Sequence, residues 1–282
     1  MSPLAGGWCY DEVDCLCRAG TSLGTNTVHK PVGSCGCINP KEDGTMVTDC
    51  NCIHMPYSDG ASFAGYVPGN VSVPGMPGKS IQMRGIKNLD GVIQFALKNG
   101  MDKATEFVLT GGSAGGLSTF LHADRFAAAL PAGAKAHAAP VVGYFLDHSN
   151  FKHTSKGPNG GTPNTPGWAA PGSPTAANYT MWMKYVYKMQ GMTFSPDGKT
   201  GGGLTKACQA KHPDEPWLCF MSPHMQDVIE TPFFMFNSKY DAWQLGNEFQ
   251  SVGFSLPPSL TSSSSSSLLR FRSQIRSRAL TL

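Results

Sequence analysis

The arrangement most suggestive of chemistry is a serine set among glycines, in Gly111-Gly112-Ser113-Ala114-Gly115. This G-x-S-x-G pattern follows a short apolar run and precedes a segment with helical character, the setting in which a sharp turn presents a serine as a nucleophile. Small neighbours suit such a turn because strand and helix approach each other closely. A glycine-rich turn without a chemical role is the alternative interpretation, and the rest of the sequence has to decide between the two.

A nucleophilic serine also needs an acid, a base and donors for an oxyanion. Asp241 directly follows the apolar segment FFMFNSKY and is the first candidate for the acid, while Asp147, after GYFL, is the second. Either aspartate could instead cap a turn. The backbone N–H groups of Gly7 and Trp8, in a glycine-rich turn early in the chain, are candidate oxyanion donors beside that of Ala114.

The sequence has no candidate for the base at the expected position. Where a serine is presented on such a strand-to-helix turn, the usual order along the chain is serine, acid, histidine, but no histidine follows His224. His122 is excluded, because nine residues of predicted helix place it about 13 Å along the axis from Ser113. The others are geometrically open and are interpreted first as structural or surface residues: His137, His148, His153, His212 and His224.

Hydrophobic periodicity predicts the elements that would position these residues. Helices are expected over residues 84–100, 113–130 and 178–190, and buried strands over 106–110, 141–147 and 232–238. Helices that alternate with short apolar strands indicate an α/β fold with a mostly parallel sheet flanked by helices. Residues 1–80 are expected to form long loops. The predicted division is a domain over 1–253 and a Ser/Arg-rich disordered tail over 254–282.

The charge balance does not indicate a nucleic-acid partner. The whole chain has 22 Lys+Arg and 19 Asp+Glu, but four arginines lie in the last 22 residues, where there is no acid. Without them the balance is 18 to 19, a net charge of −1. No apolar run reaches the roughly 20 residues of a membrane-spanning helix, so no membrane span is expected.

Nine cysteines indicate an oxidising compartment. Seven lie between Cys9 and Cys52, with close pairs spaced C-x-C, which is tighter than the usual spacing of a structural zinc site. Disulfides are therefore favoured over a metal, and the sequons at Asn70 and Asn178 agree with secretion. The first residues, MSPLAGGWCYDE, do not have the character of a signal peptide, so we expect the recorded start to be truncated.

Several segments, taken in order, resemble the pectin acetylesterase family (the pectinacetylesterase/Notum family of serine esterases). The matching segments are GGWC with a further cysteine (6–15), PYSDGASFAG (56–65), MRGIKNLDGVI (83–93), LTGGSAGGLSTFLHADRF (109–126), GYFLD (143–147), LCFMSPH (218–224) and TPFFMFNSKYDAWQL (231–245).

The resemblance implies a secreted, monomeric carboxylic-ester hydrolase with an α/β-hydrolase fold, disulfides, and neither cofactor nor metal. Its substrate would be an acetylated polysaccharide or an acylated protein. The resemblance also assigns roles to individual residues: Ser113 as nucleophile, Asp241 as triad acid, Gly7, Trp8 and Ala114 as oxyanion donors, and Asp147 in the substrate pocket.

The sequence departs from the family pattern at both ends. Only five residues precede Gly6, where the family has strands, and serine-rich sequence stands where the family has its histidine. One cysteine of the family is Ser58 here. We therefore expect a fold that is incomplete at both ends, from a truncated or mis-spliced gene model. The alternative function is a non-catalytic chain that binds a glycan or an acyl group.

Overall fold

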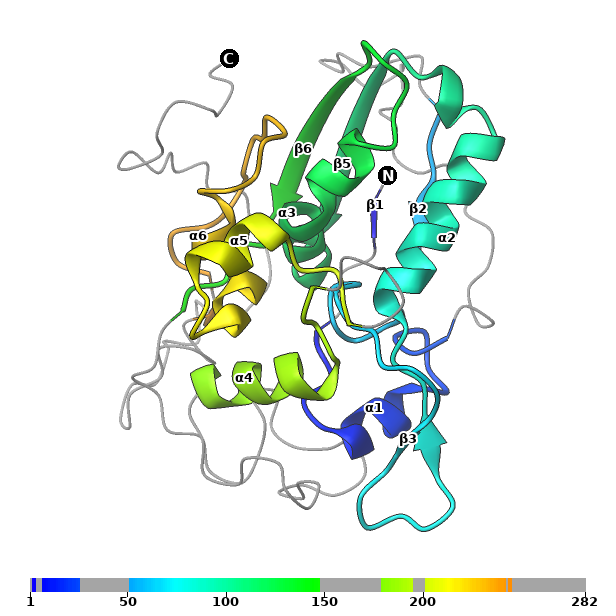
Figure 1. Ribbon diagram of the computed structural model, residues 1–282, viewed down its shortest axis with the longest axis vertical. Helices are drawn as coiled ribbons and strands as arrows, with labels where there is room; N and C mark the ends of the chain where they lie inside the picture. The colour runs from blue at the N-terminus through cyan, green and yellow to red at the C-terminus, as the bar shows by residue number, and fades with distance from the viewer. Residues whose placement is uncertain are drawn as a thin grey trace.

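The computed structural model describes residues 2–3, 7–25, 51–147, 179–194, 201–241 and 243–244. At its centre is a β-α-β unit, in which the parallel strands β5 (Glu106–Gly112) and β6 (Lys135–Val141) are connected by helix α3 (Ala114–Ala127) (Figure 1). The register runs from Glu106 opposite Lys135 to Gly112 opposite Val141. Both strands therefore end at the same edge of the sheet, which is where α3 begins.

Shorter segments extend this parallel layer on both sides. Next to β6, isolated parallel bridges join Ala138 to Phe233 and Val141 to Phe236. On the other side, β1 (Ser2–Pro3) lies beside β5 and pairs in parallel with β2 (His54–Met55). The predicted α/β fold with a mostly parallel sheet is confirmed.

Helix α3 is buried along nearly its whole length. Its alanine- and leucine-rich sequence favours a helix, and aromatic pairs fix it against the sheet. Phe126 stacks on Phe107 of β5 with ring centroids 5.4 Å apart, and Phe120 meets Phe233 edge-on at 5.5 Å. The helix that carries the candidate nucleophile is thus part of the core.

Helix α2 (Gly85–Lys98) confirms the helix predicted over 84–100. Its buried face contains Ile86, Leu89, Ile93 and Ala96, as expected for an amphipathic helix. It ends at Asn99, and Gly100 then adopts a left-handed φ of 109°. The short 3₁₀ helix η1 (Met101–Lys103) leads from there into β5.

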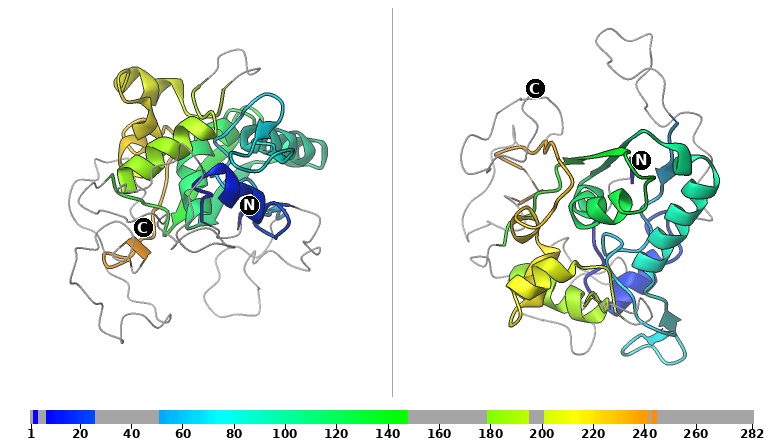
Figure 2. Two further views of the ribbon diagram at one scale, coloured as in Figure 1. Left: turned by 90° about the horizontal axis from the view of Figure 1, so that it is seen from below. Right: turned by 45° about the horizontal axis from the view of Figure 1, so that its top comes forward.

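The remaining helices lie around this unit. Below the carboxyl ends of the strands in Figure 1 are α1 (Glu12–Arg18) and α4 (Tyr179–Met189). Figure 2 shows α2 on one side of α3, and α5 (Lys206–Lys211) and α6 (Ser222–Met225) on the other. The 3₁₀ helix η2 (Pro216–Phe220) precedes α6. A hairpin of β3 (Val71–Ser72) and β4 (Ser80–Ile81) packs near α1.

The cysteines whose pairing the structure describes form disulfides rather than a zinc site. Cys9 is bonded to Cys15, which ties the Gly7-Trp8 turn to α1, and Cys208 is bonded to Cys219, which ties α5 to η2. Within the described ranges, no three His, Cys, Asp or Glu residues are grouped so that they could hold a metal ion. The prediction of disulfides is confirmed for these four residues.

Three sequence expectations are wrong in detail. The strand expected over 141–147 lies at 135–141, because Val142 turns to a left-handed φ of 44° and takes the chain out of the sheet. The strand expected over 232–238 makes only the two isolated bridges. The loops expected over 1–80 contain α1, whose first turn is capped by the Asp11 side chain, which accepts from the Asp14 amide.

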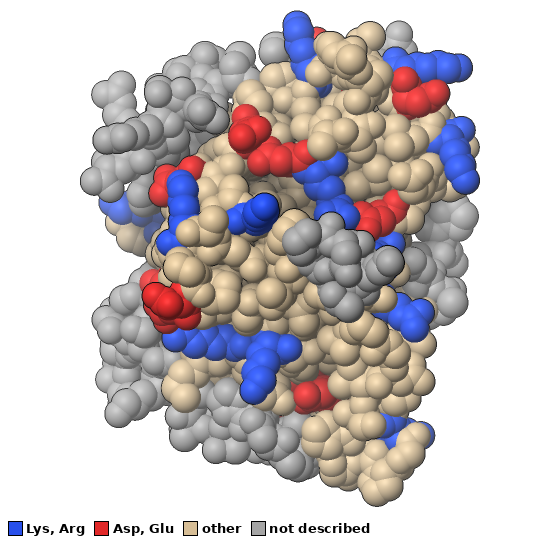
Figure 3. All heavy atoms as spheres, viewed as in Figure 1, with Lys and Arg blue, Asp and Glu red and all other residues tan. Residues whose placement is uncertain are grey.

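Charged side chains of both signs are interspersed on the face shown in Figure 3. None of the described helices has the length and apolarity to cross a membrane. The predicted tail over 254–282 lies outside the described residues, as do His148, His153 and Asn178.

Candidate active site

Ser113 occupies the turn between β5 and α3 in a conformation that a serine rarely adopts. Its φ is 54° and its ψ is −126°, so the backbone is in a sparsely populated left-handed region. Two hydrogen bonds hold it there: its amide donates to the Val141 carbonyl at 3.0 Å, and its carbonyl accepts from the Leu117 amide at 3.0 Å. A non-glycine residue in such a region costs about 1–3 kcal/mol, and such residues concentrate at functional sites. Its side chain is half-buried at the edge where the strands end.

The glycines around Ser113 allow two backbones to touch. A Cβ on Gly116 would lie 2.6 Å from the Val141 carbonyl oxygen and 2.8 Å from the Gly143 Cα. A Cβ on Gly143 would lie only 2.3 Å from the Gly116 carbonyl carbon. No side chain fits at either position, so α3 begins directly against residues 141–143. This contact explains why the segment after Val142 cannot continue as a strand.

The structure brings Trp8 and Ala114, two of the predicted oxyanion donors, into one hydrogen-bonded group. The Trp8 indole Nε1 donates to the Ser62 hydroxyl at 2.9 Å, and that hydroxyl donates to the Ala114 carbonyl at 2.8 Å. Gly7 directly precedes Trp8 and is half-buried. Arg18 of α1 fixes the same turn, because its Nη1 donates to the Trp8 carbonyl at 2.9 Å.

Ser62 is the residue in this group that sequence reasoning missed. It lies in the PYSDGASFAG segment, which had no assigned role. The available signal was a small polar residue among small apolar ones in that segment, which indicates a buried hydroxyl only once the fold is known.

Asp241 is held by the residues that follow it. Its Oδ1 accepts from the Gln244 amide at 2.9 Å. The Gln244 side chain is 5% exposed, donates to the Tyr144 carbonyl at 3.0 Å and accepts from the Leu146 amide at 3.4 Å. The Asp241 turn is therefore fastened to the segment that begins at Gly143 and touches α3.

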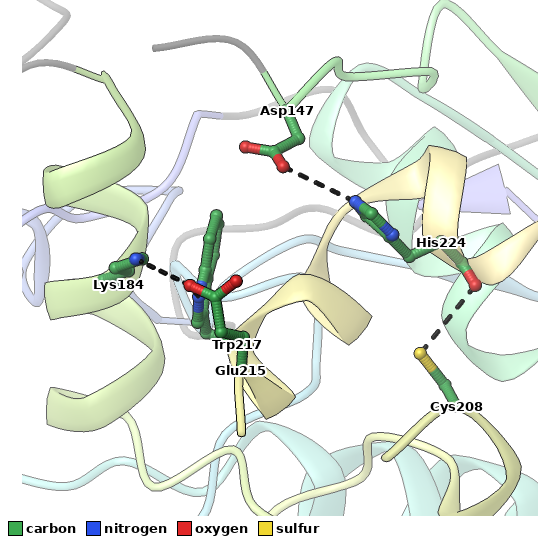
Figure 4. A network of polar contacts seen from close by, with 6 residues as sticks. All are labelled: Asp147, Lys184, Cys208, Glu215, Trp217 and His224. Atoms are coloured by element: carbon green, nitrogen blue, oxygen red, sulfur yellow. Dashed lines mark hydrogen bonds and ion pairs between the residues drawn. The ribbon is translucent and has the colours of Figure 1, made fainter. Parts of the chain in front are cut away.

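Asp147 has a different partner, shown in Figure 4. Its Oδ2 lies 3.5 Å from Nε2 of His224 in α6. The ring of His212 meets His224 edge-on with centroids 4.8 Å apart, and the pKa of His212 is lowered, first by partial burial and then by His224. Cys208 Sγ lies 3.8 Å from the His224 carbonyl oxygen, so the Cys208–Cys219 disulfide lies against the backbone of His224. Asp147 and His224 remain partly exposed, at 29% and 24% of their side chains.

Figure 4 also shows a second polar group beside α4. Lys184 lies 3.1 Å from Glu215 and above the Trp217 ring, whose Nε1 donates to the same carboxylate at 3.3 Å. The hydrogen bonds from Lys184 and Trp217 lower the pKa of Glu215. This group fastens α4 to η2.

Among the described histidines, His122 is structural, His212 and His224 form a partly exposed pair, and His54 and His137 lie on strands β2 and β6. His122 is fully buried in α3, where burial lowers its pKa to about 3 and its Nε2 lies 2.9 Å from the Ser62 carbonyl oxygen. Because a carbonyl can only accept, Nε2 carries the proton. The exclusion of His122 as a base is consistent with this contact. In the part of the chain that the structure describes, no histidine is hydrogen-bonded to Ser113 or Asp241.

Comparison with known proteins identifies relatives. The profile of the Pectinacetylesterase family matches residues 4–159. Pectin acetylesterase 7 of Arabidopsis thaliana is 28% identical over 244 residues, covering 86% of this chain and 53% of that protein. Pectin acetylesterase 5 of the same plant is 30% identical over 243 residues, covering 85% and 48%. The chain thus spans about half the length of these relatives.

The fold is shared with a solved structure. The Wnt deacylase Notum from Drosophila, in its crystal form II, superposes with a TM-score of 0.63 at 21% identity, covering 92% of this chain and 67% of that one. The described elements are accordingly part of an α/β-hydrolase fold. Together with the profile match over more than half of its residues, this shows that the chain belongs to the pectinacetylesterase family.

Proposed function

We propose that the chain is a carboxylic-ester hydrolase that removes acetyl or other acyl groups through Ser113. The observation that carries the proposal is the left-handed backbone of Ser113 at the start of a buried helix. This geometry presents a hydroxyl at the strand ends and directs the N-terminus of α3 toward it. The positive end of that helix favours the negative charge that forms when an ester is attacked.

The proposed reaction combines attack by the serine with stabilisation of the oxyanion. The Ser113 oxygen attacks the acyl carbon while a base takes its proton, and the amides of Gly7, Trp8 and Ala114 donate to the oxyanion. The alcohol leaves with a proton, and water then releases the acid from the acyl-serine. Each proton that is taken is returned, so no cofactor is required.

Asp241 is proposed as the acid that orients the base. One of its oxygens accepts from the Gln244 amide, which leaves the other to accept from an imidazole N–H. Asp147 is proposed to contact substrate, since its carboxylate is partly exposed beside His224.

The names of the relatives support the substrate class. Those relatives are called pectin acetylesterases, so an acetylated polysaccharide is the proposed substrate. An acylated protein is the second choice, supported by the fold shared with a Wnt deacylase. Secretion as a monomer is also proposed, and the two disulfides support an oxidising compartment.

The test is hydrolysis of p-nitrophenyl acetate by the wild type, by Ser113→Ala and by Ser118→Ala. Ser118 is a buried serine of the same helix and serves as the matched control. Ser113→Ala is expected to lower turnover by about 10³-fold or more, and Ser118→Ala to leave it nearly unchanged. Folded wild-type protein without Ser113-dependent turnover would overturn the proposal and favour a chain that binds glycan or acyl ligands without converting them.

A further inference from the structure

The fully buried Ser62 connects three segments that are distant in the sequence. Its amide donates to the Tyr57 hydroxyl at 2.9 Å, and its carbonyl accepts from His122 Nε2 at 2.9 Å. Its own hydroxyl accepts from the Trp8 indole at 2.9 Å and donates to the Ala114 carbonyl at 2.8 Å. Every polar atom of this residue therefore has a partner.

The two partners of the hydroxyl are residues whose amides are the proposed oxyanion donors. Trp8 comes from the turn before α1, and Ala114 from the first turn of α3, so no element of secondary structure connects them. A single oxygen atom spans the gap between them. The donors of an oxyanion hole must lie about 2.7–3.1 Å from the developing charge, with a tolerance of only about 0.5 Å, so the length of this bridge matters to the reaction.

We propose that Ser62 is a positioning residue of the oxyanion hole, whose hydroxyl sets the spacing between Trp8 and Ala114. This inference rests on the proposed function. Ser62 touches no substrate and acts only through the two residues that it joins.

The requirements of the bridge explain the residue type. One short side chain must accept from an indole and donate to a carbonyl at the same time. A serine hydroxyl does both through one oxygen, a methyl group does neither, and a longer amide accepts and donates through two different atoms. The contacts also hold a costly backbone. Ser62 has a φ of 52° and Phe63 a φ of 57°, and such left-handed residues cost about 1–3 kcal/mol each.

The surrounding contacts keep this backbone in place. The Phe63 amide donates to Asp59 Oδ2 at 2.8 Å. His122 stays neutral over the usual pH range, because burial lowers its pKa to about 3. Because the Ser62 carbonyl can only accept, it holds the single proton of the neutral ring on Nε2.

The test compares two variants that each remove one buried hydroxyl that donates to a carbonyl in the first turn of α3. Ser62→Ala removes the donor to the Ala114 carbonyl, and Thr119→Val removes the donor to the neighbouring Gly115 carbonyl at 3.0 Å. Ser62→Ala is expected to lower kcat for p-nitrophenyl acetate by about 10- to 100-fold with KM within about twofold, less than the loss of a whole oxyanion donor. Thr119→Val is expected to change kcat by less than about twofold at a similar loss of stability.

Ser62→Gly separates the hydroxyl from the backbone strain. Glycine adopts a φ near 52° at little cost, so this variant relieves strain while removing the bridge. The proposal requires kcat to fall in Ser62→Gly as it does in Ser62→Ala. Wild-type kcat in the glycine variant, or equal losses in Ser62→Ala and Thr119→Val, would overturn it.

Amide hydrogen exchange tests the inference independently of turnover. Ser62→Ala is expected to speed exchange at the Trp8 and Ala114 amides and to leave α2 unchanged. If the wild type lacks Ser113-dependent turnover, the proposed function fails, but exchange still decides the role of Ser62. Unchanged exchange at both amides would refute the positioning role, and so would an equal increase throughout the chain.

Discussion

The two halves of the candidate site are built in different ways. The half that contains Ser113, Trp8 and Ala114 is packed into the core, and buried hydrogen bonds through Ser62 join its parts. The half that contains Asp241 and Asp147 is more open. Its aspartates lie on irregular segments, fastened through the backbone amide and the side chain of Gln244 and through a 3.5 Å pair with His224.

This difference matches the chemistry that each half is proposed to perform. An oxyanion hole works because its dipoles are fixed before charge develops, so burial and rigidity favour it. Proton transfer and substrate binding require access, so partial exposure suits the groups that perform them. We therefore expect changes in the first half to affect stability and rate together, and changes in the second to affect rate or substrate binding alone.

The largest expected effect distinguishes the two aspartates of the open half. Asp241→Asn is expected to lower kcat by about 10³- to 10⁴-fold, because an amide orients the base in the wrong tautomer. Asp147→Asn is expected mainly to raise KM. Steady-state kinetics of both variants on p-nitrophenyl acetate and on an acetylated polysaccharide provide the measurement. The reverse ranking would assign the role of triad acid to Asp147 and that of the base to its neighbour His224.

The second effect concerns the backbone contact below Ser113. Gly116→Ala is expected to destabilise the fold by about 3 kcal/mol, because its Cβ has no room against Val141 and Gly143. Gly91→Ala is the control, since Gly91 also lies in a helix but has nothing within 4 Å of an added Cβ. It should be neutral or stabilising by about 0.5–1 kcal/mol. Urea unfolding measures both, and similar free energies for the two variants would contradict the close approach.

The third effect is a dependence of stability on pH. It comes from Asp59, which accepts from the Phe63 amide next to Ser62 in the buried half. Burial raises the pKa of Asp59 from 3.8 to about 7. The protonated Asp59 carboxyl therefore makes its full contribution to the free energy of unfolding below pH 3.8. This contribution is lost as the pH rises toward 7, because the carboxyl loses its proton at a lower pH in the unfolded chain than in the folded one. The loss amounts to about 2 kcal/mol between pH 5 and pH 6.5 at the limiting slope.

The variant Asp59→Asn removes the titrating carboxyl and so isolates its contribution to the pH dependence of stability. The lowered pKa of His122 acts in the opposite direction, since its contribution is lost as the pH falls from 6.5 toward 3. That contribution is common to both proteins and cancels in their difference. The free energy of unfolding of Asp59→Asn relative to wild type should therefore rise between pH 5 and pH 6.5. A difference that stays constant over this range would show that Asp59 is already ionised in the folded state.

Local pattern was enough to predict the centre of the fold. The G-x-S-x-G motif, the apolar run before it and the helix after it are contiguous, so the turn that presents Ser113 could be recognised from neighbouring residues alone. The amphipathic spacing of Ile86, Leu89 and Ile93 likewise predicted α2.

The errors arose where distant segments decide the structure. The run VVGYFLD is as apolar as a buried strand, but Val142 leaves the sheet because Gly143 must meet Gly116, a contact that no local pattern encodes. Ser62 was missed for the same reason, since its four partners are five to 60 residues away in the sequence. The pairing of Asp147 with His224 also depends on the folding of α6 against the segment after β6.

The contact between Gly116 and Gly143 has a mechanical consequence. At these two glycines no side chain separates α3 from the segment that continues to Asp147, so the two backbones are in direct contact. Close-packed protein interiors have low compressibility and transmit strain. A shift of residues 143–147 would therefore be passed directly to the first turn of α3, next to Ser113.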